Sequence, residues 1–120
     1  VYNLHSYYRE FENFVVFGVG GIDSGPFGLN EKETMDKLKK DFSRFKNKKK
    51  ILLTHEPPFN TRVDNIGWAH VGSVKLRDFI INYKPDLVLT GHIHETFGLI
   101  DYLGKTKILN LGKKGAIIEL

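Results

Sequence analysis

The stretch Leu-Val-Leu-Thr-Gly-His-Ile-His, residues 87–94, joins a short apolar run to a pair of histidines. A second apolar run, Ile-Leu-Leu-Thr at residues 51–54, likewise ends at a histidine, His55. Side chains two residues apart in extended backbone point to the same side, so His92 and His94 can direct both imidazoles to one point. Function in α/β sheets usually lies where strands end. We therefore predict a functional site at the ends of these two strands.

The segments between the two runs predict a β-α-β unit. Strand 51–54 is followed by a long irregular stretch, after which Ser73 is the expected N-cap of a helix. Pro85 ends that helix, because the residue before a proline disfavours helical backbone, and strand 87–90 follows. Two strands joined through a helix are normally parallel neighbours. Since parallel strands end at the same edge of a sheet, the histidines that follow them should converge there.

The flanking segments predict one more helix and further strands. Asn30 opens a helix whose apolar stripe extends to about Phe45. The other strands are apolar runs bounded by turn residues, at 14–19, 97–103, 107–111 and 116–120, the last three forming an antiparallel meander. The predicted fold class is therefore α/β. The length fits a single domain over residues 1–120 and no more.

Composition excludes several classes of protein. The chain is 41% hydrophobic and 27% charged, which is typical of globular proteins and argues against disorder. No apolar stretch approaches the roughly 20 residues that span a bilayer, and the N-terminus lacks a signal-peptide pattern, so we expect no membrane partner. The absence of cysteine excludes disulfides and thiolate metal ligands. A cytoplasmic location is the simplest expectation.

The formal net charge of +4 comes largely from one run, Lys46-Asn47-Lys48-Lys49-Lys50. Such a run before a strand is usually a solvated turn whose lysines oppose aggregation. No aromatic residue is interleaved in it. We therefore expect nucleic acid only as a phosphate-bearing substrate and not as a separate partner.

The three strand-end histidines have the chemistry of metal ligands. Imidazole is the commonest neutral metal ligand in proteins and suits manganese, iron and zinc. A lone strand-end histidine is more often a loop residue bonded to backbone, but the Gly-His-x-His spacing with a third histidine at the same edge favours metal binding. One alternative is a mononuclear zinc site of three histidines with an open fourth position.

His70 is the candidate substrate-binding residue. It lies in the irregular stretch before Ser73 and can face a substrate as a proton donor. A loop histidine that only caps or is solvated fits these residues equally well. Asn60 and Arg62, in the same stretch, can border a phosphate.

Two motifs together resemble a known family. Thr54-His55-Glu56-Pro57-Pro58, followed by Gly91-His92-Ile93-His94, is similar to the C-terminal half of a calcineurin-like metallophosphoesterase. Asn110-Leu111-Gly112 resembles the closing strand of that family, and the segments Asn3-Leu4-His5 and Gly18-Val19-Gly20-Gly21 resemble the stretch after its asparagine-histidine motif. The resemblance implies a β-sandwich flanked by helices, of which this chain is the C-terminal half.

The resemblance also implies a hydrolase of phosphate esters with two divalent ions, manganese, iron or zinc. By this similarity His55 and His92 bind one ion and His94 binds the other. The metals activate a hydroxide as the nucleophile, so no catalytic side chain is required. The implied protein is a metal-dependent phosphatase.

The family's acidic motifs are missing from this sequence. An Asp-x-His motif, a Gly-Asp motif and a Gly-Asn-His-Asp/Glu motif are all absent, and Asp23, Asp64, Asp86 and Asp101 lack the matching neighbours. Two divalent ions about 4 Å apart repel strongly, so a bridging carboxylate is required. We expect the chain alone to be inactive, and a missing N-terminal half or a second copy to complete the site. A further alternative is a non-catalytic scaffold of the same fold.

Overall fold

The structure is a computed structural model that describes residues 7–19, 31–91 and 93–112. Its strands are β1 (Tyr7–Glu10), β2 (Phe14–Val19), β3 (Lys49–Thr54), β4 (Leu87–Thr90), β5 (Ile100–Leu103) and β6 (Thr106–Asn110). Its helices are α1 (Glu31–Phe42), α2 (Val74–Tyr83) and the short 3-10 helices η1 (Arg62–Asp64) and η2 (His94–Thr96).

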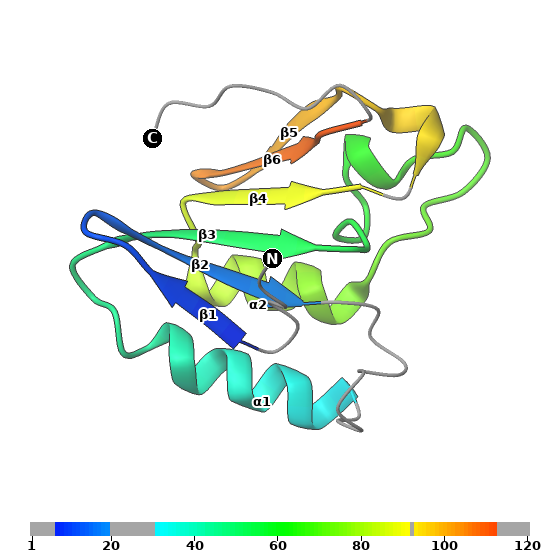
Figure 1. The fold of residues 1–120 in the computed structure, drawn as a ribbon. Coiled ribbons are helices and arrows are strands. Elements are labelled where there is room, and N and C mark those ends of the chain that lie inside the picture. Colours follow the sequence, from blue (N-terminus) through cyan, green and yellow to red (C-terminus); the bar gives the residue numbers. More distant parts are fainter. Residues whose placement is uncertain (1–6, 20–30, 92, 113–120) are drawn as a thin grey trace.

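The strands form one six-stranded sheet in the order β1-β2-β3-β4-β6-β5 (Figure 1). Strands β2, β3, β4 and β6 run parallel, while β1 and β5 are antiparallel to their neighbours at the two sides of the sheet. Residues 51–53 of β3 pair in register with residues 87–89 of β4, so the predicted parallel β-α-β unit is confirmed. Both strands end at the same side of the sheet, here called the C-terminal edge.

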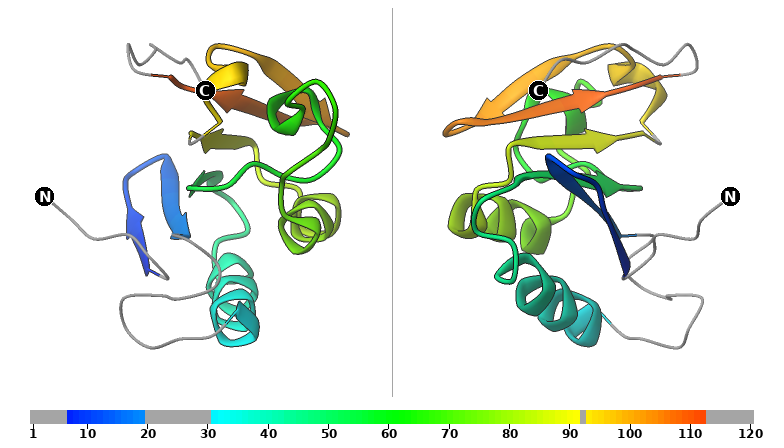
Figure 2. Two further views of the ribbon diagram at one scale, coloured as in Figure 1. Left: turned by 90° about the vertical axis from the view of Figure 1, so that its right-hand side faces the viewer. Right: turned by 60° about the vertical axis from the view of Figure 1, so that its left-hand side comes forward.

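Both long helices pack on one face of this sheet (Figures 1 and 2). Successive side chains of a strand alternate between the two faces of a sheet. The side chains of Val15, Leu52 and Val88 point to the face that the helices cover and are fully buried there. Phe42 of α1 and Phe79 of α2 meet with ring centroids 5.1 Å apart. These five residues belong to one hydrophobic core, which fixes the sheet that carries the histidines.

Helix α2 begins and ends as the sequence predicts. The Ser73 hydroxyl accepts a hydrogen bond from the Leu76 amide at 3.1 Å, which satisfies a free donor of the first turn. At the other end, Lys84 adopts a left-handed backbone (φ 53°) and its amide donates to the Ile80 carbonyl. Pro85 then directs the chain into β4.

Several predicted boundaries differ from the structure. Helix α1 ends at Phe42, although Phe45 of the predicted stripe still packs against the core. Strand β5 begins at Ile100 and not at residue 97, because η2 takes up the preceding turn and Gly98 has a φ of 83°. Strand β1 was not predicted, since its Tyr-Tyr-Arg-Glu sequence has no clear alternation.

The mixed α/β class is confirmed, with the β-α-β unit and the antiparallel β5–β6 hairpin of the predicted meander. The described residues contribute one sheet to the expected sandwich. The predicted strand 116–120 and the segments 3–5 and 20–21 lie outside the described residues. Within the described part of the chain, no helix is long and apolar enough to span a membrane.

Candidate functional site

His55 lies at the C-terminal edge, directly after β3. Its amide donates to the Val19 carbonyl at 3.2 Å, and its own carbonyl accepts from the Thr90 hydroxyl at 3.5 Å. The residue is therefore held by its backbone between the ends of β2 and β4, while its side chain is exposed. An exposed imidazole at this position is accessible to a ligand from solvent.

His94 opens η2, the turn that follows β4. Its side chain is exposed, and its ring stacks on Phe97 with centroids 4.9 Å apart and an interplanar angle of 26°. The structure thus places two of the three predicted metal ligands on the segments that leave β3 and β4. His92 lies outside the described residues.

The described donors account for only part of a metal site. Two neutral imidazoles suit a first-row divalent ion. However, no group of three or more histidine, cysteine, aspartate or glutamate residues that could hold a metal is found among the residues that the structure describes. The histidine donors fit the implied metals, whereas the carboxylates of a dinuclear centre are not gathered by these residues.

Asn110 fixes the turn that carries His94. This fully buried side chain donates from Nδ2 to the Ile93 carbonyl at 2.9 Å and to the Thr96 hydroxyl at 2.8 Å. The amide of Gly112 donates to its Oδ1 at 3.3 Å. The backbone on the N-terminal side of His94 and the last residue of η2 are therefore anchored to β6. Residues 110–112 stood out in the sequence only through the family resemblance.

Gly91 directly follows β4, at the start of the Gly-His-x-His motif. In the structure a Cβ at this position would meet nothing within 4 Å, and its φ lies outside the left-handed region. The backbone at Gly91 therefore does not require glycine for conformational reasons.

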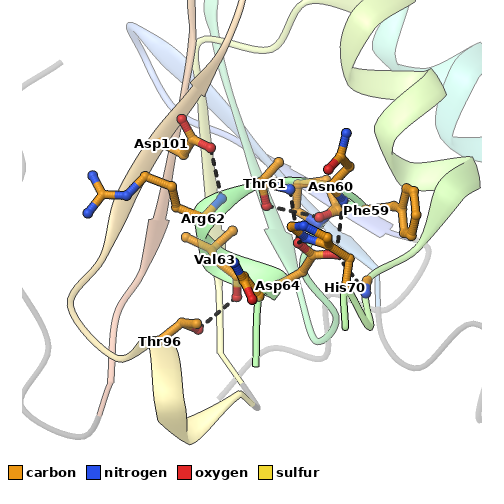
Figure 3. Close-up of polar contacts among 12 residues, drawn as sticks. Phe59, Asn60, Thr61, Arg62, Val63, Asp64, His70, Thr96 and Asp101 are labelled. Carbon is orange, nitrogen blue, oxygen red and sulfur yellow. Dashed lines mark hydrogen bonds and ion pairs between the residues drawn. The ribbon is translucent and has the colours of Figure 1, made fainter. Parts of the chain in front are cut away.

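The irregular stretch between β3 and α2 is tied to the same edge. The Thr96 hydroxyl of η2 donates to the Val63 carbonyl of η1 at 2.7 Å. The Arg62 amide donates to Oδ2 of Asp101 at 2.8 Å, and its guanidinium Nη1 to the Ile100 carbonyl at 3.3 Å. These bonds connect η1 to both η2 and β5 (Figure 3). Arg62 is thus engaged with β5, away from its predicted role at a phosphate.

Asp64 is the buried centre of this stretch, with no exposed surface. Its Oδ1 accepts from the Thr61 amide at 2.9 Å and lies 2.6 Å from Nδ1 of His70. Its Oδ2 accepts from the amides of Asn60 at 2.9 Å and Gly72 at 3.0 Å. Figure 3 shows the carboxylate between the two halves of the loop. Burial raises the pKa of Asp64, but these four hydrogen bonds outweigh it and hold the pKa below its usual value.

Asp64 was not singled out from the sequence, because it lacks the neighbours of the family's acidic motifs. A local signal was present, since Thr61-Arg62-Val63-Asp64 has the threonine and acidic residue of a capping box. That pattern predicts a turn closed by the Asp64 carboxylate on the Thr61 amide, which the structure shows. It does not predict the contact with His70.

The lowered pKa of Asp64 predicts acid sensitivity of the fold. The carboxylate stabilises the folded chain fully above the unfolded value of 3.8, and this contribution is lost as the pH falls through the lower folded pKa. We expect the free energy of unfolding, measured by urea denaturation across acidic pH, to fall steeply below 3.8 in the wild type. The Asp64→Asn variant should show a shallower fall. An equal fall of the free energy of unfolding with pH in the two proteins would contradict a lowered pKa of Asp64 in the folded chain.

Comparisons with known proteins give one family and one fold. A family model described as calcineurin-like phosphoesterase matches residues 2–96. A crystal structure of TT1561 of Thermus thermophilus superposes with a TM-score of 0.69 at 23% identity, covering 92% of this chain and 49% of that one. A second crystal structure gives a TM-score of 0.73 at 21% identity and covers 92% and 46%.

At these identities the two structures establish the fold alone. The chain spans about half the length of either one, at 46% and 49%. A comparison with curated proteins found no match.

Proposed function

The chain belongs to the calcineurin-like phosphoesterase family, and on that premise we propose that it forms part of a metal-dependent phosphoesterase that hydrolyses phosphate esters. Members of this family generally use divalent metal ions. The observation that carries the proposal is the placement of His55 and His94 on the segments that leave two adjacent parallel strands. This is where the resemblance puts the metal ligands.

In this proposal the three histidines are divided between two metal ions. His55 and His92 bind one ion, and His94 binds the other, with manganese, iron and zinc all compatible with imidazole. Divalent ions held by these residues would supply Lewis-acid activation of the ester and of water. The buried Asn110 holds the His94 turn in place for this purpose.

The acidic ligands of the proposed site come from outside the described residues, either from an N-terminal half or from a second copy of the chain. The sheet face opposite the helices supports such an addition. Leu53, Leu89 and Leu109 form a row across three neighbouring strands on that face, and the first two are only half-buried. An apolar row of this kind is suited to packing against another sheet.

Metal-dependent binding of a phosphate compound tests the proposal. Phenyl phosphate is titrated calorimetrically into the chain with and without Zn²⁺, and its hydrolysis is followed over a range of chain concentrations. We expect binding only with Zn²⁺, and negligible hydrolysis at low concentration. A specific activity that rises with chain concentration would identify the second copy as the source of the acidic ligands. Binding or hydrolysis that is unaffected by chelation would overturn the proposal.

A further inference from the structure

Asp64 and His70 form a hydrogen-bonded pair that takes no part in the proposed metal binding. We propose that Asp64 is a positioning residue that fixes the tautomer and direction of His70, so that Nε2 of His70 contacts the phosphate ester. This inference rests on the proposed function and adds a metal-free contact to the same site.

Asp64 has the rigidity that such a role requires. Its carboxylate accepts from Asn60 and Thr61 on one side of the loop and from Gly72 on the other, at 2.9–3.0 Å. A buried carboxylate with three backbone donors cannot rotate without leaving those donors unsatisfied. Its fourth contact, at 2.6 Å to Nδ1 of His70, is therefore made in one fixed direction.

The carboxylate determines which ring nitrogen of His70 carries the proton. An ionised carboxylate only accepts hydrogen bonds, so Nδ1 of His70 must be the donor. The neutral ring then has its lone pair on Nε2, and a second proton, when present, is carried there. A carboxylate that orients an imidazole through Nδ1 in this way leaves Nε2 for the substrate.

The ring of His70 is partly exposed and is held through Nδ1. The imidazole of His70 is 34% exposed, and Phe59 packs against it at an angle of 64° with centroids 6.0 Å apart. Within the described part of the chain, no hydrogen bond to Nε2 is found. A half-exposed ring held through one nitrogen and packed on one side is preorganised for a ligand at its other nitrogen.

The loop brings His70 to the C-terminal edge. The Ser73 amide donates to the Pro57 carbonyl at 2.9 Å, and the Phe59 amide to the Ser73 carbonyl at 3.0 Å. The segment ending at Ser73 therefore runs alongside the segment that leaves His55, and Pro58 pairs with Ser73 in a parallel bridge. His70 lies on the same loop system as the candidate metal ligands, where a protonated Nε2 can donate to a phosphate oxygen.

The imidazole nitrogen-15 chemical shifts of His70 give a direct test of the positioning. We expect the Nδ1-protonated tautomer in the neutral wild-type ring. In Asp64→Asn the amide carbonyl can retain the Asn60 and Gly72 bonds, while its NH₂ group faces Nδ1. The tautomer should therefore change to Nε2-protonated. Asp101→Asn is the matched control, because Asp101 also anchors η1 but lacks a contact with His70. An Nε2-protonated wild type overturns the inference.

The contact with the ester is tested by phenyl phosphate affinity in the Zn²⁺-loaded chain. We expect Asp64→Asn and His70→Gln each to weaken binding about tenfold or more, the scale of one charge-assisted hydrogen bond, with Zn²⁺ affinity unchanged. If Asp64 acts through His70, then Asp64→Asn causes little further loss in a His70→Gln background. Undiminished binding in both single variants would overturn the inference and leave the proposed function standing.

Two other outcomes are also decisive. A loss in Asp101→Asn equal to that in Asp64→Asn would show that loop anchoring, and not His70, is responsible. If no variant, including the wild type, binds phenyl phosphate, then the proposed function and the ester contact both fail. The nitrogen-15 shifts still decide the positioning by Asp64 in that case.

Discussion

Replacing Gly72 with alanine should destabilise the chain by about 2–3 kcal/mol, at the upper end of the usual cost of overpacking. A Cβ at this position would lie 2.5 Å from the Pro57 carbonyl oxygen and 2.7 Å from the carbonyl carbon and oxygen of Pro58. All three are backbone atoms of the segment that leaves His55. Either this segment or the segment that carries residue 72 must therefore move. The Gly72 amide also donates to Asp64, and that hydrogen bond would be strained as well.

Urea denaturation monitored by circular dichroism measures this loss. Gly91→Ala is the matched control, because a Cβ there meets nothing within 4 Å. We expect the control to change the free energy of unfolding by less than about 0.5 kcal/mol, as for most surface substitutions. Similar midpoints for Gly72→Ala and the wild type would show that the close approach of residue 72 to residues 57–58 does not hold in solution.

Replacing His94 with alanine should lower the affinity of the chain for Zn²⁺ or Mn²⁺ by roughly a hundredfold or more, since even the loss of an outer-shell partner typically costs 10–100-fold. The exposed His94 side chain stacks on Phe97, and its removal should leave the fold intact. Calorimetric titration of the metal into the wild type and the variant measures the change. The His55→Ala variant should show a comparable loss.

Glu95→Ala is the control for His94, because Glu95 is the exposed neighbour in the same short helix η2. Its replacement tests whether any change to this turn weakens metal binding. If Glu95→Ala and His94→Ala reduce the affinity equally, the imidazole is not a ligand. If neither changes it, metal binds elsewhere.

The sequence was sufficient to predict the central β-α-β unit. Its strands are short apolar runs, and the helix between them has a serine cap and a terminating proline, so local signals agree with the parallel pairing that forms. The edge that carries His55 and His94 follows from this order alone. The strand order across the rest of the sheet, with β6 between β4 and β5, was not predicted, because it depends on a pairing between distant segments.

The Asp64–His70 contact could not be predicted for a different reason. It arises in a stretch without regular periodicity, where Asn60 takes a left-handed backbone with φ 59° and Gly72 packs against a proline carbonyl. The direction of the Asp64 carboxylate depends on amides from both halves of this loop. Sequence spacing carries no information on such a closure. In the same way, the bond from Asn110 to η2 depends on the pairing of β6 with β4.

Equilibrium dialysis against Zn²⁺ or Mn²⁺, followed by elemental analysis, tests the proposed metal-binding role of these histidines most directly. If the chain supplies histidines to a site whose acidic ligands lie elsewhere, the wild type should bind less than a full pair of ions per chain. The variant with both His55 and His94 replaced by alanine should then bind almost none. Equal metal content in the wild type and this double variant would contradict the assignment of a metal site to the C-terminal edge.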